Sequence, residues 1–177
     1  MAPAGDMTSL RAALDAGADA VYFGVVSMNM RASAKNFSVE DLPEIAQVCH
    51  TAGARAYLAL NTIIYDREIE LAESLVKAAA AAGIDAVICW DFAILELALR
   101  YGIAPFISTQ MSVANSASLL FLYRRFAIRR FVLARECTLE EIVSIRRRLK
   151  EALGAEAENI ELEVFAHGAM CVSVSGR

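Results

Sequence analysis

The residue types best suited to chemistry gather near the carboxyl end of the chain, in residues 163–177 (EVFAHGAMCVSVSGR). The carboxylate of Glu163 and the imidazole of His167 could transfer protons, and the thiol of Cys171 could ligate a metal. Glu163, Phe165 and His167 are spaced by two residues, so in a β-strand their side chains would lie on one face. This stretch therefore predicts one edge of a site whose other members come from elsewhere in the chain.

The composition excludes several classes of protein. Hydrophobic residues make up 57% and charged residues 21% of the 177 positions, which predicts a folded domain rather than a disordered chain. The net charge of -4 argues against generic coating of nucleic acid. No uncharged apolar run of about 18 residues is present, so we expect no membrane span. The four cysteines are widely scattered without a C-x-x-C pair, which predicts free thiols and a cytoplasmic location.

A repeated unit predicts how the chain is organised. The stretches AGADAVYFG (16–24), AGARAYLAL (52–60) and AGIDAVICW (82–90) each follow an amphipathic run and place Ala-Gly before a β-rich segment. This pattern indicates a helix that ends at a left-handed glycine, a short turn and a buried strand. Weaker copies occur at YGIAPFIST (101–109) and FAIRRFVLA (126–134).

The repeats predict alternating strands and helices. We expect strands near 1–4, 20–24, 55–60, 85–90, 105–109, 130–134 and 160–166. We expect helices near 7–16, 38–52, 67–82, 91–101, 115–126 and 138–153, with capping boxes at Ser38 and Thr138. Apolar strands between helices favour parallel pairing.

These elements favour an α/β fold of the TIM-like (β/α)-barrel type with about seven of its eight units. A doubly wound sheet is the rival, but no glycine-rich dinucleotide loop follows the first strand. An incomplete barrel leaves an open edge, which predicts a possible homo-oligomer through that edge.

In such a barrel the site lies at the carboxyl ends of the strands, and polar residues follow every predicted strand there. Guanidinium groups in that position could bind carboxylates of an anionic partner. The expected substrate-binding residues are Arg31, Lys35, Asn36, Asn61, Gln110 and Arg135. The expected acid–base residues are Glu136, Glu163 and His167.

Structural roles remain open for several of these residues. Asn61 could cap the next turn, and residues 108–110 could start a helix. Arg135 and Glu136 could form an ion pair on the rim. Asp91 is expected to cap its helix, and His50 is expected at the surface of another.

The motif E-x-F-x-H-G-A-M-C (163–171), followed by Ser-Gly-Arg (175–177), resembles the signature of peptidase family U32, the collagenase-like proteases. Other segments agree in order along the chain: APAGD (2–6), AGADAVYFG (16–24), NMRASAKNF (29–37), LALNT (58–62), STQMSVANS (108–116) and VLARECTLEEI (132–142). The resemblance implies a barrel-like amino-terminal domain, so we expect residues 1–177 to be the single barrel portion of a longer protein.

The resemblance implies two kinds of enzyme. The family name implies a hydrolase of the collagenase type, acting on peptides. Better-understood members imply hydroxylation of RNA bases or of an aromatic quinone precursor, with an iron–sulfur cluster and with prephenate as a co-substrate. Cys171 matches the first cluster cysteine, and the second would follow Arg177 directly. One thiolate does not hold a cluster that takes about four ligands, so we expect this chain alone to lack the cluster and to be inactive.

We expect the hydroxylation chemistry, with the cluster near Cys171 as its redox centre. The peptidase alternative would use His167, Glu163 and Glu136, although no metal-ligand spacing accompanies them. The third alternative is a non-catalytic scaffold or assembly partner, whose polar rim would tolerate alanine substitution.

Overall fold

The computed structural model describes residues 1–26 and 37–167. They fall into two compact units, Met1–Pro105 and Phe106–Arg177. The first unit contains β1 (Ala2–Ala4), α1 (Met7–Asp15), β2 (Ala20–Phe23), α2 (Leu42–Thr51), β3 (Arg55–Leu60), α3 (Ile69–Ala81), β4 (Ala86–Cys89) and α4 (Phe92–Arg100). Strand β5 (Ala104–Ile107) runs across the division, and α5 (Ser116–Phe126), β6 (Arg130–Val132), α6 (Leu139–Leu153) and β7 (Glu161–Glu163) follow. Short 3₁₀ turns are η1 (Val39–Asp41), η2 (Asp66–Glu68), η3 (Thr109–Met111) and η4 (Gly154–Asn159).

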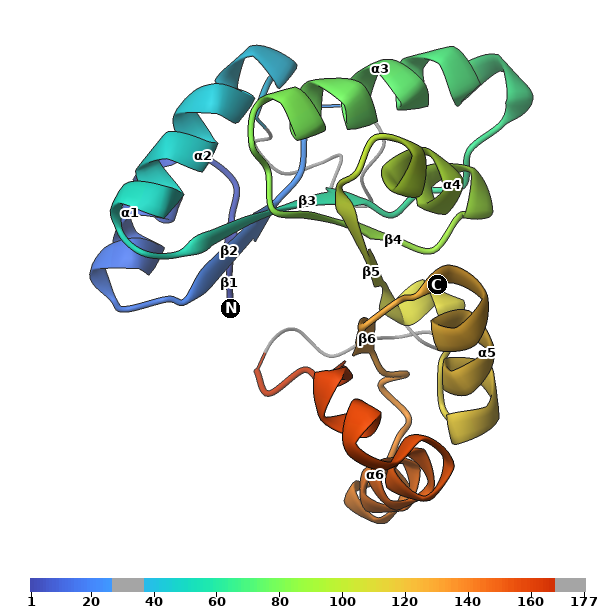
Figure 1. The fold of residues 1–177 in the computed structure, drawn as a ribbon. Helices are drawn as coiled ribbons and strands as arrows, with labels where there is room; N and C mark the ends of the chain where they lie inside the picture. The colour runs from blue at the N-terminus through green and yellow to red at the C-terminus, as the bar shows by residue number, and fades with distance from the viewer. Residues whose placement is uncertain (27–36, 168–177) are drawn as a thin grey trace. The chain divides into compact units, whose positions relative to one another are not determined.

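The strands pair in parallel and in sequence order within each unit (Figure 1). In the first unit Ala4 pairs with Phe23, and Leu60 pairs with Cys89. In the second unit Ile107 pairs with Phe131. The described residues form seven parallel strands that alternate with helices, which is the α/β, TIM-like (β/α)-barrel architecture that the repeats predict.

The repeated helix–glycine–strand unit is confirmed. Gly17, Gly53 and Gly83 have φ angles of 83°, 73° and 79°, in the left-handed region that glycine adopts without steric cost. Each of these glycine amides donates to a carbonyl in the last turn of its helix, as Gly17 does to Leu14 at 2.9 Å. The fifth copy differs, because Ala127 occupies the left-handed position with φ 55°.

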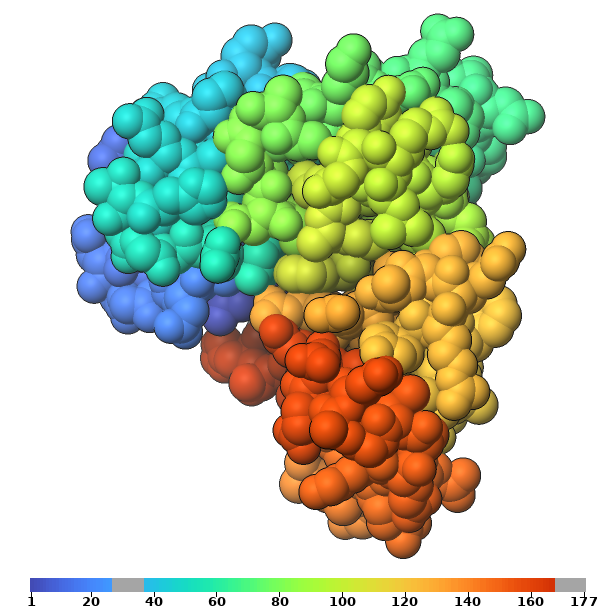
Figure 2. All heavy atoms as spheres, viewed as in Figure 1, coloured from blue at the N-terminus to red at the C-terminus, as the bar shows by residue number. Residues whose placement is uncertain are grey.

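The strands of the first unit form its core. Val21, Leu58 and Val87, on three neighbouring strands, are completely buried. Figure 2 shows α2, α3 and α4, coloured cyan to yellow-green, at the surface of this unit. α2 packs on β3, and α3 packs on α4. Because helices cover these strands, the strand segments are unbroken hydrophobic runs in the sequence.

The predicted helix caps are present. Ser38 and Asp41 form one capping box, and Thr138 and Glu141 form another. Asp91 caps α4, as expected, by accepting from Ala93 N at 2.8 Å. None of the helices in the described residues is long and apolar enough to cross a membrane.

The predicted length of the last strand is wrong. Strand β7 ends at Glu163 rather than near residue 166. Val164 and Phe165 are 50% and 51% exposed, so the chain beyond Glu163 lacks the alternation of buried and exposed side chains that a strand on a core would have. Glu163, Phe165 and His167 therefore do not share one face of a strand.

Candidate functional site

The polar segment after β5 is buried. Ser108, Thr109 and Gln110 are 5%, 3% and 8% exposed, and they are the buried polar residues of the part of the chain that the structure describes. The hydroxyl of Ser108 donates to Oε1 of Gln110, and the hydroxyl of Thr109 lies 3.5 Å from the same oxygen. These contacts fix the plane of the Gln110 amide, which suits a group that orients a substrate.

The backbone that follows this segment is strained. Ser112, which ends η3, has φ 54° in the left-handed region, where a residue with a Cβ pays a steric cost. Its amide donates to the carbonyl of Thr109 at 2.8 Å. Strain of this kind persists where surrounding contacts enforce it, and it is frequent at functional sites.

Backbone hydrogen bonds bring the carboxyl ends of the last three strands together. The amide of Ala134, just after β6, donates to Val113 at 2.9 Å, and the amide of Leu133 donates to Glu163 at 2.9 Å. Arg135 then stacks on the ring of Phe165, with 4.2 Å between the guanidinium carbon and the ring centroid. The ends of β6 and β7 are therefore neighbours within the second unit, with Arg135 beside Phe165.

Glu163 has a different setting from the one predicted. Its carboxylate lies 3.9 Å from the guanidinium of Arg130, which also pairs with Glu161 and stacks over Phe106. Burial raises the pKa of Glu163, although Arg130 opposes the shift. A raised pKa suits a proton donor, but the partner of this carboxylate is Arg130, on β6, rather than His167. His167 and Glu136 are both exposed.

Asn61 lies in the first unit, at the carboxyl end of β3. Its main-chain carbonyl accepts from the indole of Trp90 at 3.1 Å, which ties the ends of β3 and β4 together. Four predicted site residues lie outside the described residues: Arg31, Lys35, Asn36 and Cys171.

The described thiols all have raised pKa values. Burial raises the pKa of Cys49 to about 11 and that of Cys89 to about 12, and burial followed by nearby carboxylates raises the pKa of Cys137. These settings favour the protonated form of each thiol in the metal-free chain. Residues 1–26 and 37–167 also contain no group of three or more His, Cys, Asp or Glu side chains that could hold a metal ion.

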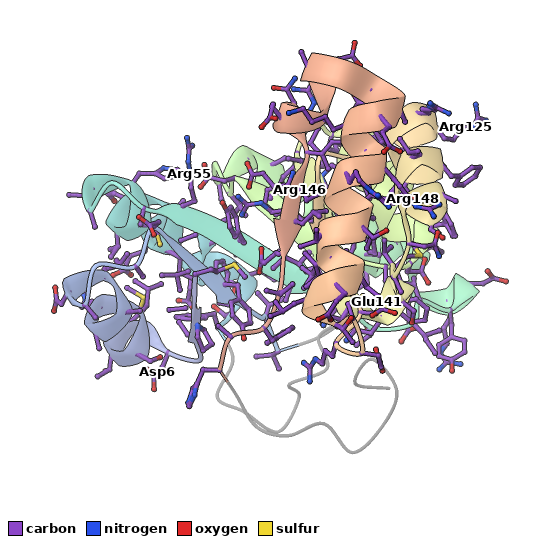
Figure 3. All side chains as sticks on the ribbon, turned by 90° about the horizontal axis from the view of Figure 1, so that it is seen from below. Asp6, Arg55, Arg125, Glu141, Arg146 and Arg148 are labelled. Atoms are coloured by element: carbon purple, nitrogen blue, oxygen red, sulfur yellow. The ribbon has the colours of Figure 1, made fainter. Side chains whose placement is uncertain are left out.

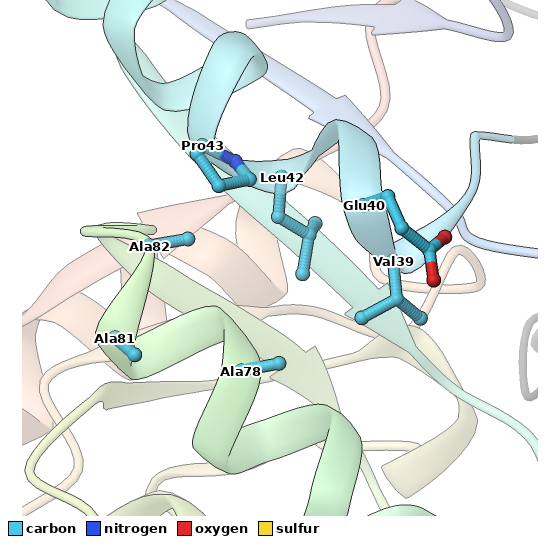
Figure 4. A pocket seen from close by; sticks show the side chains of 7 residues that line it. All are labelled: Val39, Glu40, Leu42, Pro43, Ala78, Ala81 and Ala82. Carbon is cyan, nitrogen blue, oxygen red and sulfur yellow. The ribbon is translucent and has the colours of Figure 1, made fainter.

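A hollow of about 380 Å³ lies on the helical layer of the first unit (Figure 4). It is lined by methyl and methylene groups with one carboxylate, from residues Val39, Glu40, Leu42, Pro43, Ala78, Ala81 and Ala82. Binding sites need a few convergent polar groups to orient a ligand, and this lining offers Glu40 alone. The polar strand ends are therefore the better candidate site.

Reasoning from the sequence missed one polar cluster. Oδ2 of Asp85 accepts from His50 Nε2 at 2.9 Å and from the amide of Ala56 at 2.8 Å. Oδ1 accepts from Arg55 at 2.7 Å, and Arg55 itself reaches into solvent (Figure 3). The placement of His50 at the helix surface is confirmed, with 44% of its side chain exposed. The available signal was Asp85 itself, which directly precedes a buried strand.

Comparison with known proteins gives the family. The profile of Peptidase family U32 matches residues 5–177. A protein named "Collagenase" from Porphyromonas gingivalis is 43% identical over 180 residues, covering 100% of this chain and 43% of that protein. The 23S rRNA 5-hydroxycytidine C2501 synthase of Escherichia coli is 36% identical over 177 residues, covering 100% of this chain and 25% of that protein.

The solved structure of the U32 peptidase Mk0906 has the same fold. It aligns with a TM-score of 0.66 at 15% identity, covering 92% of this chain and 66% of that one. The chain spans less than half the length of the two curated relatives. The match over residues 5–177 includes the strand ends described above, and the chain belongs to peptidase family U32.

Proposed function

We propose that this chain is the barrel portion of a protein that hydroxylates RNA bases. The observation that carries the proposal is the 36% identity, over 100% of the chain, to a protein named as an rRNA 5-hydroxycytidine synthase. The polar segment at the end of β5 supports it, because a fixed amide such as that of Gln110 can read the edge of a base.

The proposed roles follow from the placement of each residue. Gln110 orients the base, and Arg135, held against Phe165, binds an anionic group of the RNA or of the co-substrate. Exposed His167 and Glu136 are the proposed groups for proton transfer. Arg31, Lys35, Asn36 and Asn61 complete the proposed binding set, the first three outside the described residues.

Hydroxylation converts a C–H bond of the base into C–OH, which is a two-electron oxidation. We propose that an oxygen-donating organic co-substrate supplies the oxygen atom and is reduced by two electrons, with prephenate as the candidate. An iron–sulfur cluster would supply electron transfer, and its proposed ligand in this chain is Cys171, since residues 1–26 and 37–167 contain no group of three or more His, Cys, Asp or Glu side chains that could hold a metal ion. The proposed location is the cytoplasm, and self-association through the open edge of the sheet is part of the proposal.

Peptide hydrolysis is the second candidate, because the relative named "Collagenase" is 43% identical. A peptidase needs an activated nucleophile or a metal-bound water. Cys137 is the half-buried thiol of the second unit, and burial and the carboxylates of Glu141 and Glu136 raise its pKa. That setting opposes a thiolate nucleophile at Cys137, so the peptidase candidate rests on His167, Glu163 and Glu136.

The test is deletion of the gene in its natural host, followed by mass spectrometry of nucleosides from rRNA and tRNA. We expect one hydroxylated nucleoside to disappear and to return when the gene is restored. An unchanged set of hydroxylated nucleosides, together with cleavage of collagen by the purified protein, would overturn the proposal in favour of the peptidase.

A further inference from the structure

Two aromatic side chains are exposed near the carboxyl ends of β3 and β4. Tyr65, in the loop between β3 and α3, is 54% exposed, and Phe92, the first residue of α4, is 55% exposed. Ile63 is 54% exposed in the same loop. Large apolar side chains grouped at a surface mark an interaction site more often than single ones do.

Hydrogen bonds hold this surface in place. The amide of Ile64, next to Tyr65, donates to Asp91, next to Phe92, at 3.2 Å, so the two aromatic residues extend from adjoining loops. Glu68 closes the turn that follows, accepting from Tyr65 N at 2.9 Å. The indole of Trp90 bonds to Asn61. The two rings are therefore carried on a backbone that is already ordered, which lowers the entropic cost of binding.

A positively charged side chain lies against one of the two rings. The guanidinium of Arg67 lies over the ring of Tyr65, 4.9 Å from its centroid. The carboxylates nearby are mostly engaged, because Glu68 bonds to Tyr65 and Asp91 bonds to Ile64 and Ala93. Asp66 and Glu70, in the same segment, are exposed carboxylates. Aromatic rings with a stacked arginine are the chemistry that binds unpaired bases, because every base has a π-face.

We propose that Tyr65, Arg67 and Phe92, called here the aromatic platform, stack unpaired bases of a single-stranded RNA segment. The inference rests on the proposed function and deepens it, because it specifies unpaired RNA as the substrate class. The platform follows the carboxyl ends of β3 and β4, the end of the strands at which sites of this fold lie. Asp66 disfavours close phosphate contacts, so stacking supplies most of the binding and the dependence on salt is shallow.

The test is fluorescence anisotropy with a labelled single-stranded RNA of about ten nucleotides, using the purified protein. We expect Tyr65→Ala and Phe92→Ala each to weaken binding about tenfold. Tyr65→Phe should bind like the wild type, because it keeps the ring. Phe121→Ala is the matched control, since Phe121 is an aromatic residue of α5 with 60% exposure and lies outside the platform. The same RNA annealed into a duplex should bind weakly to all variants.

The outcomes separate this inference from the proposed function. Loss of single-strand binding in both platform variants supports the platform, even if the nucleoside analysis finds no hydroxylation. Normal binding by both variants overturns the platform, even if deletion of the gene removes a hydroxylated nucleoside. Binding of a collagen peptide, rather than RNA, that depends on the same two rings also overturns the proposal, in favour of a peptide site.

Discussion

The main-chain amide of Ile64 donates a hydrogen bond to Oδ2 of Asp91 at 3.2 Å, across 27 positions of sequence. Oδ1 of the same carboxylate accepts from Ala93 at 2.8 Å and caps α4. One side chain thus starts a helix and holds the loop that follows the neighbouring strand. This arrangement couples the stability of α4 to the position of Tyr65.

Substitution of Asp91 should separate the contribution of the α4 cap to stability from that of the hydrogen bond to Ile64. Asp91→Asn keeps one acceptor oxygen, so it can serve only one of the two amides, and we expect a loss of about 1 kcal/mol in the free energy of unfolding. Asp91→Ala removes both acceptors and should cost about 2 kcal/mol. Urea unfolding measures both values. Equal stability of the wild type and Asp91→Ala would contradict the dual role.

Asp85 should contribute more to the free energy of unfolding than is usual for a residue in a turn. Its carboxylate accepts from His50, Arg55 and the amide of Ala56, and its side chain is 14% exposed. We expect Asp85→Asn to lower the free energy of unfolding by about 2 kcal/mol. Asp19, which precedes β2 as Asp85 precedes β4 and is exposed, is the matched control, and Asp19→Asn should change stability by less than about 0.5 kcal/mol.

The contribution of Asp85 should depend on pH. Burial acts to raise the pKa of Asp85, but hydrogen bonds from Ala56, His50 and Arg55 outweigh it, so the pKa in the folded chain is lowered. A group of this kind stabilises the fold fully above its unfolded pKa of about 3.9 and loses that contribution as the pH falls through its folded pKa. The stability difference between wild type and Asp85→Asn should therefore be constant near neutral pH and shrink in acid. A difference that grows in acid would contradict this assignment.

Ala127 should be a site where glycine stabilises the chain. It follows α5 with φ 55°, while the corresponding turns after α1, α2 and α3 use glycine. We expect Ala127→Gly to raise the free energy of unfolding by about 1 kcal/mol, because it removes the steric cost of the left-handed conformation. Ala82→Gly is the control, since Ala82 ends α3 with φ -76° and should lose stability instead. Thermal unfolding of both variants distinguishes the two signs.

The cysteines should differ in reactivity. Cys49 and Cys89 are buried with pKa values raised to about 11 and about 12, so iodoacetamide at pH 8 should leave both unmodified in the folded protein. Cys137, half-buried beside Glu141, should react slowly, and faster in Glu141→Gln. Peptide mass spectrometry with and without urea measures the extent of modification. Rapid labelling of Cys89 in the folded protein would contradict the burial and the raised pKa of this thiol.

The regular parts of the fold could be predicted because their determinants are local. Ala-Gly before a β-rich run marks the end of a helix at Gly17, Gly53 and Gly83, and the structure has a left-handed glycine at each position. Thr138 with Glu141 marks the start of α6 from residues three positions apart. Local hydrogen bonds and steric limits decide these features, so a single sequence carries the information.

Contacts between distant residues could not be predicted in the same way. Arg135 stacks on Phe165 and Glu163 pairs with Arg130, and each contact spans about thirty positions. The sequence predicts too long a strand at β7, because alternation of residue types does not show where the hydrogen-bonded pairing of a strand ends. Glu163 and His167 are therefore not aligned on one strand face, since the strand stops at Glu163.

The central claim is that this protein hydroxylates RNA bases with a site at these strand ends. It is tested most directly by the level of the hydroxylated nucleoside in a deletion strain that carries site variants. Gln110→Ala removes the buried amide at the end of β5, and Arg135→Ala removes an exposed cation after β6, so at least one variant should remain folded. We predict that both fail to restore the nucleoside at normal protein levels, while the control Arg125→Ala, on α5, restores it fully. Full restoration by both site variants would contradict a catalytic rim at these strand ends.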